Sequence, residues 1–414
     1  MSRHQVPTKK SNILTVLFFS TILFVISFAD ALMSYVSPIF IEDQVQSTFL
    51  MGIIFAFSSF VGIICDILFP KLFTNQTHFF FLKVTVLTAI AFPLTFIFFP
   101  QHILTILFAM AIWGVYYELN TFSSFEFVHS YVHISEHAKT WGIMQAFQSG
   151  AYALAPLLAT QLLLTGYIDL FTTVLFSLGI ALLFTIIFRL FFMKKKHTHR
   201  TILSPVKTWI TEAHIWKLLF KKVWPLLLLQ LLVNTIDASF WTIGAIYMHE
   251  ISQTHALGSL FLTSYIVPSV LVGLFLSKIP VTFGKKRIAL ISTALTGVGL
   301  SSFYFIQEIP VLLVVTFLAS TFLAIAVPEI KATFEDYISR LKTSNSEMIG
   351  MQSSSASLAY VLGPIIATFL ATATTIKTAF SLIGVLVLVT ALYLLVITPK
   401  KIRMPQKELS EGHF

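Results

Sequence analysis

The sequence contains one ten-residue phrase twice, as AYALAPLLAT at positions 151–160 and as AYVLGPIIAT at positions 359–368. The copies share Ala-Tyr, Leu, Pro and Ala-Thr at equivalent places and lie 208 positions apart in a chain of 414 residues. Shorter echoes follow nearly the same spacing, because Asp30-Ala31 recurs as Asp237-Ala238 and FEFVHS at 125–130 recurs as FEDYIS at 334–339. This repetition indicates a chain built from two related halves.

The composition places these halves in a membrane. Hydrophobic residues make up 56% of the chain, charged residues only 11%, and the mean hydropathy is +0.86. Apolar runs of about 20 residues are long enough for an α-helix to cross a bilayer, and backbone polar groups in lipid require such helices. We predict twelve spans, at 12–37, 47–68, 79–99, 102–126, 139–165, 168–192, 223–248, 256–278, 286–306, 310–332, 347–371 and 376–398.

The basic residues predict the orientation of these spans. If the N-terminus lies in the cytoplasm, all of the 27 Lys and Arg residues except Lys377 fall in cytoplasmic segments. We therefore expect a multi-pass protein of the cell membrane with both termini cytoplasmic. The net charge of +9 then reflects topology and contact with anionic lipids, so no nucleic-acid partner is needed.

The duplication also predicts the domain boundaries. We expect an N-terminal six-helix bundle at 1–192, a cytoplasmic central loop at 193–222, a C-terminal six-helix bundle at 223–399 and a cytoplasmic tail at 400–414. Within the loop, Trp209, Ala213, Trp216 and Phe220 keep helical spacing, which predicts an amphipathic helix along the membrane surface.

Small residues and prolines distinguish the repeated phrase. Ala155 lies in a stripe of small residues spaced four apart, as does Gly363 in the second copy, and such stripes let helices approach closely in lipid. Pro156 and Pro364 each remove a backbone donor. Two interpretations stay open: tightly packed helices without a moving role, or sliding surfaces between the halves.

Taken together, these features resemble the major facilitator superfamily of secondary transporters, over nearly the whole chain. The family's loop motif after the second helix is matched by Gly62, Asp66 and Lys71, although Phe69 replaces its second Gly. The resemblance implies an all-α membrane protein with twelve transmembrane helices in two pseudo-symmetric six-helix bundles. It also implies that the first, fourth, seventh and tenth helices line a central cavity.

Acidic residues within the spans fall on those cavity helices. A charge facing lipid is costly, so such residues usually face water or a partner and mark a transport path. A buried carboxyl group can also load and release protons. The candidates for proton coupling are Asp30, Glu118, Glu126, Asp237 and Glu329. The alternative is that these acids only hydrogen-bond the helices together.

The expected substrate follows from the other polar and aromatic residues. No Lys or Arg lies at mid-membrane depth in the predicted spans, which disfavours an anionic substrate. Acids with aromatics suit a cationic, amphipathic or neutral molecule. The candidate substrate-binding residues are Trp113, Tyr117, Asn120, Gln145, Gln148, Asn234 and Trp241.

Three functions stay open. The first is a proton-driven exporter. Its expected partners are a small molecule, protons and membrane lipids, and we expect the chain to act as a monomer. The second is proton-coupled uptake of a sugar or other nutrient, and the third is a membrane-embedded lipid enzyme or lipid flippase. No Walker loop is present, which favours a proton gradient over ATP, and we expect neither a cofactor nor catalysis.

His129, His133 and His137 share one helical stripe; we expect solvated histidines there, with a metal site or pH sensor as the alternative.

Overall fold

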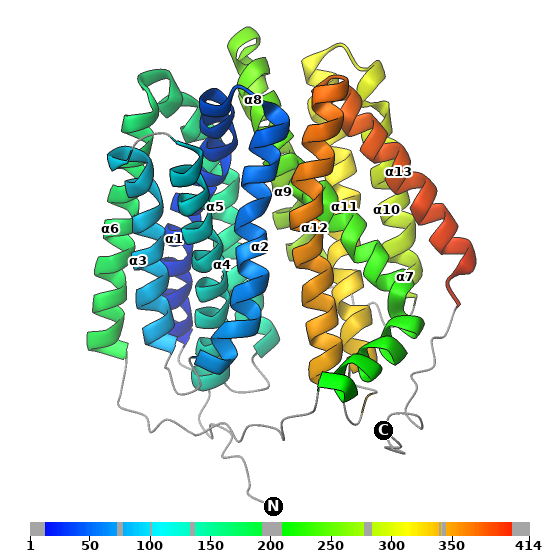
Figure 1. The fold of residues 1–414 in the computed structure, drawn as a ribbon, viewed down its shortest axis with the longest axis horizontal. Coiled ribbons are helices and arrows are strands. Elements are labelled where there is room, and N and C mark those ends of the chain that lie inside the picture. The colour runs from blue at the N-terminus through cyan, green and yellow to red at the C-terminus, as the bar shows by residue number, and fades with distance from the viewer. Residues whose placement is uncertain are drawn as a thin grey trace, which may run out of the picture. The chain divides into compact units, whose positions relative to one another are not determined.

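The structure is a computed structural model that describes residues 13–72, 78–99, 102–132, 137–192, 209–276, 284–338, 341 and 345–399. Within these ranges all regular secondary structure is helical, which confirms the predicted all-α fold class (Figure 1). The helices are α1 (Ile13–Val45), α2 (Thr48–Leu72), α3 (His78–Phe98), α4 (Ile103–Tyr131), α5 (His137–Thr165), α6 (Tyr167–Phe192), α7 (Trp209–Trp241), α8 (Ile243–Thr254), η2 (Ala256–Leu260), α9 (Phe261–Leu276), α10 (Lys285–Ser301), η3 (Ser302–Phe305), α11 (Ile309–Ile338), α12 (Asn345–Ala373) and α13 (Ile376–Ile397).

Each of the twelve predicted spans coincides with helical residues. Within the described residues, ten helical segments are long and apolar enough to cross a membrane. The predicted spans 139–165 and 256–278 are the two that do not meet this measure. α5 carries polar residues such as Gln145, Gln148 and Ser149 in its N-terminal half, and α9 is short, with 16 residues.

α7 begins earlier than predicted. It starts at Trp209 and runs continuously past Pro225 to Trp241, and α8 follows after a turn at Thr242. The N-terminal part of α7 turns away from the rest of the helix (Figure 1), as expected for a helix with an internal proline. The described part of the predicted loop, from Trp209 onward, is therefore continuous with α7.

Aliphatic residues make up the buried face of this segment. Ile215, Leu219 and Val223, spaced four apart, are buried, whereas Phe220 is 55% exposed. Trp216 packs near Gly350 of α12. The expected position of this segment along the membrane surface stays a prediction.

Contacts divide the chain into two units, each described here by itself. The N-terminal unit contains α1 to α6 together with residues 245–270. The C-terminal unit contains the residues from the start of α7 to Gly244 and the residues from Leu271 onward. In the N-terminal unit α1 packs on α5 and α6, and α3 packs on α4 and α6. η2 contacts α5 in this unit.

The C-terminal unit repeats the same packing with the equivalent helices. α7 packs on α12 and α13, and α10 packs on α11 and α13. Close approaches depend on glycine: a Cβ added to Gly297 of α10 would lie 2.7 Å from the backbone nitrogen of Leu388 in α13. The equivalence of the helix pairs agrees with the duplication read from the sequence.

Candidate functional site

Asp30 of α1 is at the centre of the N-terminal unit. Its carboxyl group is 6% exposed and accepts a hydrogen bond at Oδ1 from the indole nitrogen of Trp113, at 2.9 Å. Its Oδ2 accepts a hydrogen bond from the hydroxyl group of Tyr152 in α5. The acid is thus satisfied by side chains of two other helices, as expected for a buried polar group.

Asp237 of α7 has the equivalent arrangement in the C-terminal unit. The hydroxyl group of Tyr360 in α12 donates a hydrogen bond to Oδ2 of Asp237, at 2.6 Å. Asp237 is partly buried. Each of the two repeated aspartates is therefore bonded within its own unit to the tyrosine of the repeated phrase.

The aromatic residues of α4 surround Asp30. Trp113 is 3% exposed and stacks on Phe92 of α3, with ring centroids 4.9 Å apart. The ring of Tyr117 lies 5.5 Å from that of Trp113, and its hydroxyl group is 3.4 Å from the Ser34 hydroxyl group of α1. A small pocket beside the carboxyl group has room for roughly one water molecule. Its lining comes from α1, α3, α4 and α6: Ile26, Ala29, Asp30, Met33, Ala89, Phe92, Trp113, Tyr116, Val174 and Leu178.

The structure brings together two of the seven predicted substrate-binding residues, Trp113 and Tyr117, next to Asp30. Asn120 follows on the same helix, partly buried, and its Oδ1 has no hydrogen-bond partner among the described residues. Gln145 of α5 is exposed and donates to the Ser149 hydroxyl group at 3.2 Å. Gln148, Asn234 and Trp241 are partly buried.

Glu118 of α4 belongs to a separate acidic pair. It interacts with Asp66 of α2 through a side-chain hydrogen bond, and its Oε1 lies 3.1 Å from where a Cβ on Gly62 would be. The absence of a side chain at Gly62 therefore gives Glu118 room beside α2. The side chain of Lys71, the third residue of this predicted motif, lies outside the described part of the chain.

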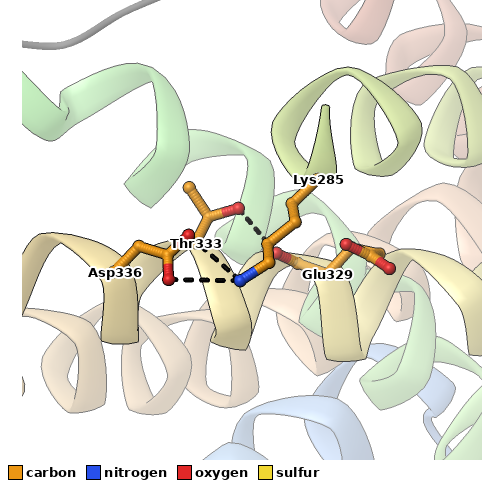
Figure 2. A network of polar contacts seen from close by, with 4 residues as sticks. All are labelled: Lys285, Glu329, Thr333 and Asp336. Atoms are coloured by element: carbon orange, nitrogen blue, oxygen red, sulfur yellow. Dashed lines mark hydrogen bonds and ion pairs between the residues drawn. The ribbon is translucent and has the colours of Figure 1, made fainter. Parts of the chain in front are cut away.

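Glu329 of α11 belongs to a polar network in the C-terminal unit. Lys285 of α10 donates to both carboxylate oxygens of Asp336, at 3.1 and 3.0 Å, and the Thr333 hydroxyl group donates to the backbone carbonyl of Glu329 at 2.7 Å (Figure 2). Lys285 also interacts electrostatically with Glu329, whose carboxyl group is directed away from the ammonium group (Figure 2). Glu329 is 6% exposed, and its Oε2 has no hydrogen-bond partner in the described residues. Glu126, the remaining predicted acid, is partly buried in α4.

The small-residue stripe of α12 packs within its own unit at Gly363. A Cβ added there would lie 2.8 Å from the Cβ of Ala238 and 3.5 Å from the Cα of Thr235, both in α7. Ala155 of α5 is fully buried, and Pro156 and Pro364 are also buried. Gly363 therefore permits close approach of α12 and α7.

The histidine stripe falls mostly outside what the structure describes, since neither His133 nor the side chains of His129 and His137 are included. Among the described residues, no group of three or more His, Cys, Asp or Glu side chains could hold a metal ion.

The sequence analysis missed three residues of these sites. Tyr152 and Tyr360 hold the repeated aspartates, and Lys285 forms an ion pair with Asp336. A signal for the tyrosines was present, because both belong to the repeated phrase and each recurs with the repeated aspartate.

Comparisons with known proteins agree with this architecture. The family model described as Major Facilitator Superfamily matches residues 226–413. The fold resembles a solved structure titled "Crystal structure of nucleoside transporter NupG", with a TM-score of 0.70, 12% sequence identity, and coverage of 92% of this chain and 98% of that chain. No curated protein sequence matches this chain.

These observations indicate a multi-pass membrane protein whose fold is similar to that of the solved nucleoside transporter. The C-terminal part of the chain matches the family model of the major facilitator superfamily, and this match supports the resemblance read from the sequence.

Proposed function

We propose that the protein is a secondary active transporter that works by alternating access and couples the movement of a small molecule to protons. The observation that carries this proposal is the buried carboxyl group of Asp30, held by Trp113 and Tyr152 and repeated as Asp237 with Tyr360. An ionisable group inside a membrane segment is costly to keep, which favours a functional role.

The surroundings of Asp30 suit a group that exchanges a proton. Burial favours the neutral acid, whereas the donors Trp113 and Tyr152 stabilise the carboxylate. Opposing influences of this kind allow a modest change in solvent access to alter the protonation state. Asp237 would serve in the same way in the other unit, and Glu118, Glu126 and Glu329 are further candidates for proton transfer.

For the substrate we propose an amphipathic, cationic or neutral small molecule that the protein exports. Tyr117, Asn120, Gln148, Asn234 and Trp241 are partly buried and would contact it in the course of transport. Trp113 is enclosed by α1, α3 and α4, so we assign it to positioning Asp30 and remove it from substrate contact.

Uptake is the second candidate direction. The similar solved structure is titled a nucleoside transporter, and a nucleoside is a neutral molecule with an aromatic base, within the substrate class proposed here. The family match gives no support to the alternative of a lipid enzyme.

Proteoliposomes with an imposed pH gradient of either sign test the proposal. The compounds are a panel of nucleosides, neutral sugars and amphipathic cations, and the measurement is accumulation of each above its equilibrium level. Accumulation of at least one compound that reverses with the sign of the gradient supports proton coupling. If every transported compound accumulates to the same level whatever the sign of the gradient, the proposed proton coupling is overturned.

The cellular arrangement is part of the same proposal. We propose that the protein acts as a monomer in the cell membrane, with the bundles 1–192 and 223–399 on either side of a cytoplasmic connection and both termini in the cytoplasm. The charge distribution supports this orientation.

A further inference from the structure

We propose that Tyr152 and Tyr360 are positioning residues that connect the protonation of the repeated aspartates to the bending of α5 and α12. The inference rests on the proposed proton coupling, and it assigns a role to residues that lie outside the predicted coupling and substrate sites.

Each tyrosine lies four residues before a proline of the same helix. Pro156 follows Tyr152 in α5, and Pro364 follows Tyr360 in α12. In a regular helix the backbone N–H of the later residue would donate to the carbonyl group of the tyrosine, and proline has no such N–H. The side chain that binds the aspartate thus belongs to the residue four positions before the proline, to whose carbonyl group the proline cannot donate.

The threonine that ends each copy of the phrase adds a second local feature. The hydroxyl group of Thr160 donates to the carbonyl of Pro156 at 2.9 Å, and that of Thr368 donates to the carbonyl of Pro364 at 2.7 Å. Threonine bonds of this type to the carbonyl four residues earlier tend to bend helices. Tyr, Pro and Thr of the phrase therefore form the same bending element in both halves.

The hydrogen bonds to aspartate attach this bending element to another helix. Tyr152 joins α5 to α1, and Tyr360 joins α12 to α7. Beside the second bond, Gly363 packs against Ala238, the residue that follows Asp237. Both helix pairs are in close contact.

Protonation of the aspartate changes the strength of this attachment. A hydroxyl group bonds a carboxylate about twice as strongly as it bonds a neutral acceptor. Proton uptake by Asp30 therefore weakens the connection between α1 and α5 at the point where α5 bends most easily, and proton release strengthens it.

The titratable groups that face Asp30 in the N-terminal unit are tyrosines. They are Tyr152 of α5 with Tyr116 and Tyr117 of α4. The helices α3 and α6 contribute apolar residues to the pocket beside Asp30, and α2 places Phe55 against Trp113. The pH-dependent part of the test below therefore uses the Asp30 and Tyr152 pair.

The first measurement is amide hydrogen exchange of the purified protein, which requires no substrate. The variants are Tyr152→Phe, Tyr360→Phe and Asp30→Asn, with Tyr393→Phe as the control because Tyr393 of α13 is exposed. We expect Tyr152→Phe to increase exchange in α5 around residues 152–160 roughly tenfold, as loss of a hydrogen bond to a charged group predicts. Tyr360→Phe should do the same in α12, and Asp30→Asn should produce a smaller increase in α5. Exchange in Tyr152→Phe equal to that of Tyr393→Phe overturns the proposal.

The second measurement is the pH profile of transport in proteoliposomes. Because Tyr152 stabilises the carboxylate, Tyr152→Phe should move the pH of half-maximal transport upward by about one unit. Tyr393→Phe should leave it unchanged, and Tyr152→Phe should have no further effect in an Asp30→Asn background. A profile unchanged by Tyr152→Phe overturns the link to protonation.

The two measurements separate this inference from the proposed function. If the wild-type protein transports without any dependence on a pH gradient, the proposed proton coupling fails, whatever the exchange rates are. If transport is proton-coupled but Tyr152→Phe matches the wild-type protein in both assays, the coupling stands and the role of the tyrosines fails.

Discussion

At the scale of single residues, the buried acids of the two units differ in their hydrogen bonding. Asp30 is enclosed and accepts hydrogen bonds from Trp113 and Tyr152, whereas Glu329 is equally buried but keeps one oxygen without a hydrogen-bond partner among the described residues. A satisfied acid contributes to stability, and an unsatisfied one is expected to have a functional reason. We therefore expect removal of a donor to Asp30 to reduce the stability of the protein.

Trp113→Phe tests the donor to Asp30. The variant keeps an aromatic ring against Phe92 but removes the indole N–H, so we expect a loss of about 1–3 kcal/mol in stability. Thermal unfolding in detergent micelles measures it. Trp141→Phe, which keeps the contact with Phe125 at the N-terminal end of α5, should lose less; an equal loss would argue against the bond to Asp30.

Lys285 and Asp336 can be compared in the same assay. Asp336 is 43% exposed, so Asp336→Asn should cost less than about 1 kcal/mol. Lys285→Met also removes the cation that acts on buried Glu329, and should cost at least about 1 kcal/mol more. Adding Glu329→Gln to Lys285→Met should restore part of the loss. Equal effects of the two single variants would show that Glu329 does not depend on Lys285.

At the scale of helices, close packing within each unit explains the small residues of the repeated phrase. Gly363 of α12 meets Ala238 and Thr235 of α7, and Ala155 of α5 is fully buried. The sequence analysis allowed a sliding surface between the halves as one interpretation. For Gly363 the contacts favour the other interpretation, tight packing of neighbouring helices.

Gly363→Leu is expected to destabilise the fold. Even a Cβ at this position would lie 2.8 Å from the Cβ of Ala238, so a leucine must separate α12 from α7 at a cost of about 1–3 kcal/mol or more. Gly142→Leu is the matched control, because nothing lies within 4 Å of a Cβ there. The yield of monodisperse protein and its unfolding temperature are the measurements. A Gly363→Leu protein as stable as Gly142→Leu would show that α12 and α7 are not held this closely.

The helices themselves were predictable from sequence, but their contacts were not. Spans such as 376–398 agree with the helix α13, because uninterrupted apolar length is a local property. The bond between Tyr152 and Asp30 joins residues 122 positions apart and depends on how α1 and α5 are rotated against each other. Hydrophobicity does not specify this rotation.

At the scale of the whole molecule, the duplication is the feature that connects sequence, fold and function. The helices that correspond in the two units pack in the same pairs. In each unit the repeated aspartate accepts a hydrogen bond from a tyrosine four residues before a proline. A transporter whose halves share one mechanism requires such repeated elements. The residues that differ between the halves, such as the α4 aromatics around Asp30, are then the candidates for unequal roles in proton transfer.

Proton movement itself tests the central claim most directly. Proteoliposomes that contain a pH-sensitive dye, without an imposed gradient, receive a transported compound, and the internal pH is followed with time. We predict that the wild-type protein changes the internal pH as substrate moves, and that Asp30→Asn exchanges substrate with at least a tenfold smaller pH change. Substrate transport by the wild-type protein with no change in internal pH, or an undiminished change in Asp30→Asn, would contradict the account.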